Sequence, residues 1–247
     1  RLGGGRKEKP TMLTIEHLTK CYSGDVKAVD DLSLTVMPGD IYGFIGHNGA
    51  GKTTTLRTVA GILSFDSGTI RVEGKSIAEE PIACKKEMAY IPDNPDLYEH
   101  LTGIQYLNFV ADIYGVSAAD RDERIKKYAD AFEMTPRLND LIGSCSHGMK
   151  QKIALISALI HDPKLLLDEP FVGLDPKAAH TLKTFMAELC ANGSAIFFST
   201  HVLEVAEKLC NKIAIIKNGR LIAAGEMDKV KGDESLETLF LELTDNA

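Results

Sequence analysis

The chain has 247 residues and a formal net charge of −7, from 28 basic and 35 acidic residues. This length suffices for one large domain or for a core domain with an additional lobe. The acidic balance argues against a protein that coats nucleic acid, although it does not exclude a local basic patch. The five cysteines are dispersed without a C-x-x-C pair, which is typical of reduced thiols in a cytosolic protein.

The longest apolar run, residues 153–160, is far shorter than the roughly 20 residues that span a bilayer, so we expect no membrane-crossing segment. No signal-peptide core follows the N-terminus, so we expect no secretion by that route. Residues 1–11 carry four basic residues and no apolar cluster. We expect them to be a remnant of an expression vector before a natural start at Met12, with a disordered basic arm as the alternative.

The first third of the chain is rich in strand-like segments. Short apolar runs alternate with turns here, at residues 13–19, 32–36, 40–46 and 68–74. The run at 40–46 is followed by glycines and then by Leu56, Val59 and Leu63, which recur at helical spacing. The sequence therefore predicts a strand, a glycine loop and a helix in succession.

The glycine loop fits the pattern G-x-x-x-x-G-K-[ST], with Gly46, Gly51, Lys52 and Thr53 in the fixed places. Its glycines let successive backbone N–H groups turn inward, and the following helix directs the positive end of its dipole to the same point. Lys52 would reach the β- and γ-phosphates of a nucleotide, and the Thr53 hydroxyl would bind Mg²⁺. The alternative, a glycine-rich turn without a ligand, fits the flanking strand and helix less well.

The chain then becomes helical. Between residues 101 and 160, apolar residues recur at helical spacing, with Tyr106, Val110 and Ile113 expected on one helix face, which Leu107, Val110 and Tyr114 are expected to widen. Apolar runs that predict strands follow at residues 164–168, 194–200 and 212–217. Strands that alternate with helices are typical of a parallel α/β sheet, so we expect a helical insertion of about sixty residues in an α/β core.

Polar residues stand at the ends of two of these strands. Asp168 and Glu169 follow a buried run, where the first could hold Mg²⁺ through water and the second could orient the attacking water. An exposed acidic turn that ends at Pro170 is the alternative. His201 follows another strand and could donate to the γ-phosphate, because ligands bind at strand carboxyl ends in open α/β sheets. A lone histidine is more often structural.

Ser146 precedes a further apolar helix and is placed to cap it. Free N–H groups of the first helical turn and a serine hydroxyl form an anion site. One nucleotide does not need two such helix N-termini so far apart in the sequence. Two copies of the protein facing head to tail would need them, because each copy would contribute its serine turn to the other copy's nucleotide.

These motifs, in this order, resemble the ATP-binding subunit of ABC transporters, from about Met12 to the C-terminus. The glycine loop is similar to the Walker A motif, LLLDEP at 165–170 to Walker B, and SHGM at 146–149 to the Ser-Gly-Gly-Gln signature. His201 stands in the place of the switch histidine.

Three further segments carry the same resemblance. GLDP at 173–176 is similar to the D-loop, and Tyr22 is similar to the aromatic residue that stacks on adenine. Residues 90–102 are similar to the loop that joins the core to the helical lobe. The residues within these motifs most resemble those of the antibiotic and multidrug-exporter branch, in which the ATPase and its permease are separate chains.

The resemblance implies an α/β fold: a P-loop NTPase core with a mainly parallel sheet, an N-terminal antiparallel β subdomain, and a helical subdomain inserted at about 95–161 of an ATPase domain at 12–247. It implies ATP and Mg²⁺ as cofactors. The residues implied to bind ATP are Tyr22, Gly46, His47, Asn48, Gly49, Ala50, Gly51, Lys52, Thr53, Thr54, Ser146 and Gly148. Those implied in catalysis are Lys52, Glu169 and His201, and those implied to hold the metal are Thr53, Asp93 and Asp168.

The function implied is ATP hydrolysis in a head-to-tail dimer, expected to be a homodimer when ATP is bound, that drives transport through a separate membrane permease. The chain would lie in the cytoplasm, peripherally on the inner face of the membrane, without nucleic acid as a partner. Two alternatives stay open: a soluble ABC-type ATPase that acts on DNA or ribosomes, and a nucleotide-binding module with weak turnover.

Three departures from the family pattern bear on activity. Asp93 replaces a glutamine in the linking loop, and His147 replaces the first glycine of the signature. The run before Asp168 has three leucines where the family usually has four apolar residues. Because a one-residue slip turns every strand side chain to the other face, we expect the deficit near Pro163, or a residue missing from the sequence.

Overall fold

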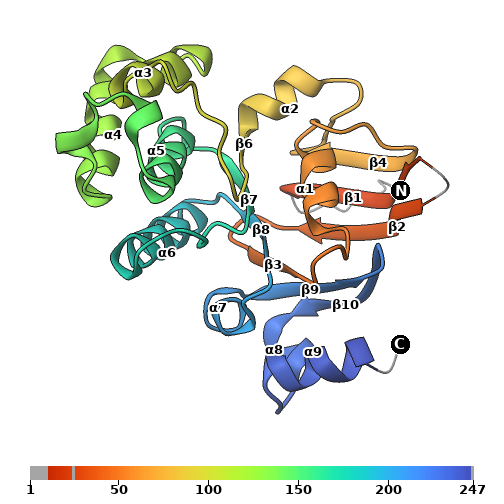
Figure 1. Cartoon of the computed structure of the whole chain (residues 1–247). Helices are drawn as coiled ribbons and strands as arrows, with labels where there is room; N and C mark the ends of the chain where they lie inside the picture. The colour runs from red at the N-terminus through yellow and green to blue at the C-terminus, as the bar shows by residue number, and fades with distance from the viewer. Residues whose placement is uncertain (1–10, 24–25, 246–247) are drawn as a thin grey trace, which may run out of the picture.

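The computed structural model describes residues 11–23 and 26–245, with the backbone alone at 165–167 and 245. Residues 1–10, where we expect a basic arm or vector remnant, lie outside this part. The chain forms two sheets beside each other (Figure 1). The first is antiparallel, in the order β2-β1-β4-β5. Its strands are β1 (Leu13–Tyr22), β2 (Val26–Val36), β4 (Ser67–Val72) and β5 (Lys75–Ser76).

The second sheet has the order β10-β9-β3-β8-β7-β6, and every pair except β10–β9 is parallel. Its strands are β3 (Ile41–Ile45), β6 (Met88–Ile91), β7 (Lys164–Asp168), β8 (Ile196–Thr200), β9 (Lys212–Lys217) and β10 (Arg220–Glu226). The β9–β10 hairpin turns at Asn218 and Gly219, whose φ angles are 49° and 80°. Asn-Gly favours this turn because both central residues need a positive φ.

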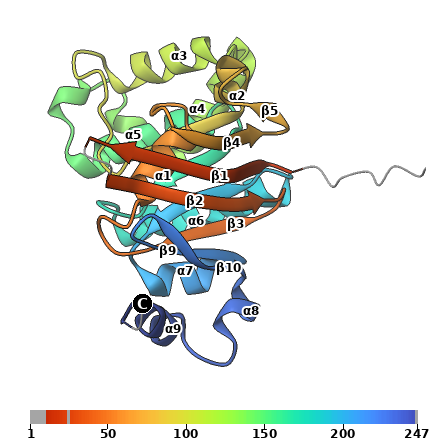
Figure 2. The same ribbon diagram turned by 90° about the vertical axis from the view of Figure 1, so that its right-hand side faces the viewer.

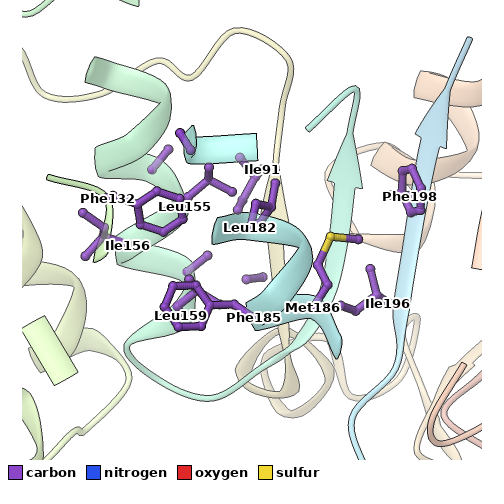
Figure 3. Close-up of a cluster of buried hydrophobic side chains, with 14 of the residues drawn as sticks. Ile91, Phe132, Leu155, Ile156, Leu159, Leu182, Phe185, Met186, Ile196 and Phe198 are labelled. Atoms are coloured by element: carbon purple, nitrogen blue, oxygen red, sulfur yellow. The ribbon is translucent and has the colours of Figure 1, made fainter. Parts of the chain in front are cut away.

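The parallel sheet is buried on both faces, so successive side chains of one strand enter different cores. Phe44 and Phe197 lie in the core toward the antiparallel sheet, together with Leu56 of α1 (Lys52–Val59). Ile45 and Phe198 lie in the opposite core, which the helices cover. Figure 3 shows side chains of this second core gathered between α5, α6 and β8. Such two-sided burial explains why the predicted strands are almost continuously apolar.

Helices lie between several of the strands and after the last strand, β10. They are α2 (Pro81–Glu87), α3 (Gly103–Ile113), α4 (Ala118–Ala131), η1 (Thr135–Arg137), η2 (Ile142–Ser144), α5 (His147–Leu159), α6 (Pro176–Ala191), α7 (Leu203–Leu209), α8 (Met227–Lys231) and α9 (Leu236–Asp245). The segments α3 to α5 follow β6 and precede β7, and they form a lobe away from the antiparallel sheet (Figures 1 and 2). This arrangement confirms the fold class, including the helical insertion. The exact division of the chain at 95 and 161 stays a prediction.

Two expectations about helices were wrong in part. The helix α1 ends at Val59, so Leu63 lies beyond it; Gly61 has a φ of 65° and terminates the helix in the usual glycine manner. On α3, Leu107 is buried and Tyr106 and Val110 are half-buried, as expected, whereas Ile113 is 57% exposed and the buried Ala111 was not expected. The helix carries more apolar residues than its own packing needs, so periodicity alone identified the buried face only in part.

The shortened run before Asp168 lies in a strand that is paired on both sides, with Met88 opposite Lys164 and Ser199 opposite Asp168. The residues that flank it, Asp162 and Glu169, have positive φ angles of 54° and 51°. A positive φ is unusual for residues with a side chain. The departures from regular backbone therefore stand at both ends of the strand, and where the deficit is taken up stays a prediction.

Candidate active site

The glycine loop at residues 46–51, called the phosphate loop from here on, joins the end of β3 to the start of α1. It lies against two backbone segments. A Cβ atom on Gly51, whose φ is 108°, would come within 2.3 Å of the Ala28 carbonyl oxygen. A Cβ atom on Gly46 would come within 2.5 Å of the Ile216 carbonyl oxygen. Any side chain at either position would displace backbone, so glycine is needed at both for the loop to close this tightly.

Lys52 is buried beneath this loop, with 6% of its surface exposed. Its Nζ donates to the carbonyl oxygens of Gly46 at 2.7 Å and of His47 at 3.2 Å. The carboxylate of Glu169 lies 3.9 Å away. Burial lowers the pKa of the Lys52 ammonium, and the Glu169 and Asp168 carboxylates act in the opposite direction. The ammonium is therefore held by two carbonyl groups of the loop and lies near a carboxylate.

The two acidic residues after β7 have different surroundings. Asp168 is 2% exposed, and its Oδ1 accepts a hydrogen bond from the Ser199 hydroxyl on the neighbouring strand β8. Glu169 instead faces the phosphate loop, and its Oε1 lies 2.9 Å from Nδ1 of His201. The parallel pairing of β7 with β8 brings these side chains to one sheet edge, as the position of strand ends predicts.

A cavity of about 360 Å³ opens above the loop. It is lined by Tyr22, Ala28, Asn48, Gly49, Gly51, Lys52, Thr53, Thr54, Asp93 and Glu169. Tyr22 is 48% exposed, and its hydroxyl lies 3.5 Å from that of Thr54. The predicted aromatic residue, the phosphate loop and a predicted catalytic carboxylate thus meet in one cavity of a size that suits a small ligand.

The other loop residues support the cavity without lining it. Ala50 is buried, donates its N–H to the His47 carbonyl at 3.1 Å, and accepts at 2.9 Å from the Gly219 N–H in the β9–β10 turn. Gly46 and His47 supply the carbonyl groups that hold Lys52. The turn of the hairpin thus braces the phosphate loop from behind.

The predicted metal ligands supply oxygen atoms of the kind that Mg²⁺ prefers. Thr53 and Asp93 line the cavity, and Asp168 lies beside Glu169 at the end of β7. Asp93 Oδ1 also accepts from the Asn94 N–H at 2.9 Å, as expected for an aspartate that starts a turn. In the described part of the chain, no three His, Cys, Asp or Glu side chains are grouped so that they could hold an ion by themselves.

The signature residues Ser146 and Gly148 do not line this cavity. Ser146 caps α5 by accepting from the Met149 N–H at 3.3 Å, as predicted. His147 is the first residue of α5, and its ring lies against the backbone of Gly173, where a Cβ atom would come within 2.7 Å of the ring. The start of α5 therefore contacts the segment predicted as the D-loop.

Sequence reasoning missed two residues of the site. Ser199 interrupts an apolar strand with a hydroxyl, and this polar position was the available signal. Ala28 lines the cavity through a strand of the antiparallel sheet and carries no chemical signal in the sequence.

Comparisons with known proteins agree with this geometry. A family model described as "ABC transporter" matches residues 29–172. The chain is 36% identical over 240 residues to the ABC-type transporter ATP-binding protein EcsA of Bacillus subtilis (strain 168), covering 95% of this chain and 97% of that protein. It is 35% identical to the ABC transporter ATP-binding protein NatA of the same organism, over 87% of this chain and 88% of that protein.

A solved structure titled "Structure of ATP binding subunit of ABC transporter" superposes with a TM-score of 0.91 at 36% identity, covering 95% of this chain and all of that one. The EcsA match and the structural match each cover nearly the whole length of this chain and of the compared chain, so the similarity extends well beyond the phosphate loop. The chain therefore belongs to the ATP-binding subunits of ABC transporters, which are ATPases.

Proposed function

We propose that this chain hydrolyses ATP in the cavity above the phosphate loop, and that it powers transport through a separate membrane permease. The observation that carries the catalytic assignment is the convergence of Lys52, Glu169 and His201 at one edge of the sheet. These side chains come from three segments that are distant in sequence, and each suits a different step of phosphoryl transfer.

Each residue has a distinct task in this proposal. Lys52 exchanges its carbonyl partners for the β- and γ-phosphate oxygens. Glu169 orients the attacking water and accepts its proton, and His201 contacts the γ-phosphate. Thr53 and Asp168, with Asp93 directly or through a water, would hold a Mg²⁺ ion, which neutralises charge on the phosphates when it is bound.

The place of the signature residues supports the proposal of a dimer. Ser146 is exposed at the start of α5 and does not line the cavity of its own chain. A second copy in head-to-tail orientation would supply its Ser146 and Gly148 to the γ-phosphate. ATP would then bridge the two chains, and hydrolysis would remove the bridge, so the bound γ-phosphate selects the closed dimer.

A groove beside the helical lobe is the docking place that we propose for the permease. This second cavity, of about 390 Å³, lies between β6 and the lobe, and it is lined on one side by Tyr106 and Val110 of α3 and by Tyr114, which directly follows this helix. Residues 92 and 95–97 line the same groove, whereas Asp93 lines the ATP cavity. A membrane partner seated in the groove would therefore touch the same loop that reaches the nucleotide.

The permease itself would supply the transport path. No helix in residues 11–23 and 26–245 has the length and apolar character that a bilayer span requires. We propose that the chain binds the inner face of the membrane through the permease, and that the partner is of the exporter type. We also propose that the dimer is a homodimer and that nucleic acid is not a partner.

Two measurements test this function. A steady-state phosphate-release assay should show ATP turnover that Lys52→Ala abolishes; turnover that does not depend on Lys52 would refute the site. Expression in cells should place the chain with a membrane protein after gentle solubilisation. Recovery with DNA or ribosomes instead would support a soluble ABC-type ATPase, and binding of ATP without phosphate release would support a nucleotide-binding module.

A further inference from the structure

The C-terminal helix α9 reaches the phosphate loop through an aromatic contact. The ring of Phe240 lies 4.8 Å from the imidazole of His47, measured between ring centres, with the planes at 59°. Phe240 is only 6% exposed, whereas His47 is exposed on its other sides. His47 is the second residue of the phosphate loop, and its carbonyl oxygen accepts a hydrogen bond from Lys52. The contact therefore joins the C-terminus of the chain to the residue that holds the catalytic lysine.

A second connection runs through the β9–β10 hairpin. The Lys217 ammonium donates to the Thr244 carbonyl oxygen of α9 at 2.5 Å. Lys217 directly precedes the turn whose Gly219 N–H donates to Ala50 of the phosphate loop at 2.9 Å. The helix α9 therefore contacts His47 directly and is connected to Ala50 through the hairpin. Because the Ala50 N–H donates to the His47 carbonyl, α9 supports both ends of the turn at residues 47–50.

The beginning of α9 is held by α7, on which it packs (Figures 1 and 2). The Glu207 carboxylate accepts from the Lys231 ammonium at 2.8 Å and from the Leu236 N–H at 3.4 Å. The helix α7 begins two residues after His201. The C-terminal helix is thus fixed between the element that follows the switch histidine and the loop that holds the phosphates.

We infer that α9 is a clamp that keeps the phosphate loop in the shape that binds ATP, and that Phe240 is a positioning residue acting through His47. Ordering a free loop on binding costs affinity, whereas a loop already held by the fold avoids that cost. Loss of the clamp should therefore weaken ATP binding and leave the rate at saturating ATP unchanged, because Glu169 and His201 stay in place. This inference rests on the proposed ATP site.

The experiment is a double-mutant cycle on ATP affinity with Phe240→Ala and His47→Ala. We expect Phe240→Ala to raise the dissociation constant about 5- to 20-fold, and the double variant to be no weaker than the weaker single variant, because both remove the same contact. Phe240→Leu should lie between wild type and Phe240→Ala. It serves as the second variant should Phe240→Ala fail to fold.

Leu239→Ala is the matched control, because Leu239 is the neighbouring residue of α9 and packs in the same core as Phe240, whereas Phe240 carries the ring that lies against His47. We expect this variant to lose thermal stability like Phe240→Ala but to bind ATP like wild type. Equal loss of affinity in both variants, additive effects in the cycle, or normal ATP binding by Phe240→Ala would each overturn the clamp. If Lys52→Ala also bound ATP normally, the proposed ATP site at the phosphate loop would itself be refuted.

Discussion

The imidazole of His201 and the carboxylate of Glu169 are directly hydrogen-bonded, with 2.9 Å between Nδ1 and Oε1. Because a carboxylate only accepts, Nδ1 carries the hydrogen in this arrangement. In the neutral ring Nε2 is then an acceptor and cannot donate to a γ-phosphate. Donation requires either a protonated ring or release from Glu169, so we expect ATP binding to rearrange this pair.

Glu169→Gln should keep ATP binding and lose most turnover, because an amide cannot take the proton of the attacking water. The variant should accumulate as an ATP-bound dimer, since hydrolysis no longer opens it. Size-exclusion chromatography with and without ATP and Mg²⁺ measures this. Hydrolysis at the wild-type rate would contradict the role of Glu169.

Tyr22→Ala should weaken ATP binding about 5- to 150-fold, because stacking of a base on an aromatic ring contributes on the order of 1–3 kcal/mol. The half-exposed ring already lines the nucleotide cavity. Tyr22→Phe is the control, because it keeps the ring and removes only the hydroxyl that faces Thr54. Equal affinities of the alanine variant and wild type, in a nucleotide titration, would make Tyr22 a packing residue.

Asp93→Asn should raise the Mg²⁺ concentration for half-maximal hydrolysis on the order of 10-fold, the effect typical of a residue that supports a metal directly or through water. Asparagine keeps an oxygen that can accept from the Asn94 N–H, so the turn itself should survive. The measurement is a Mg²⁺ titration at saturating ATP. An unchanged midpoint would leave Asp93 with the turn as its only role.

His161 should make stability depend on pH. Its ring stacks on Tyr114 with 3.6 Å between ring centres, and burial lowers its pKa from 6.5 to about 4. Between these values the unfolded chain binds more protons than the folded one, so stability falls as pH drops through this window, by about 3 kcal/mol at most.

The substitution His161→Phe keeps an aromatic ring against Tyr114 and removes the titration. Urea unfolding at several pH values from 4 to 7 should therefore show a smaller loss of stability at low pH than in wild type. Identical pH profiles of the two proteins would show that the protonation of His161 is not linked to unfolding.

The motifs with local chemistry could be predicted from the sequence because each is contained in a few consecutive residues. The phosphate loop around Lys52 needs only a strand, glycines and a helix in succession, and the cap at Ser146 needs only its own helix turn. Strands such as β3 and β8 were recognisable because burial on both faces requires nearly continuous apolar residues. The alternation of strands and helices predicted the α/β core, and the order of these motifs carried the family resemblance, which added the antiparallel subdomain to the fold class.

Only the tertiary structure decided which distant segments meet. The sequence by itself determined that Glu169 and His201 end two strands, but their hydrogen bond depends on β7 and β8 being neighbours in the sheet. The same holds for Phe240 and His47, which no local pattern connects. Periodicity indicates which apolar side chains share one face of a helix or strand. It does not indicate what that face packs against, because burial depends on which element the fold brings to that surface.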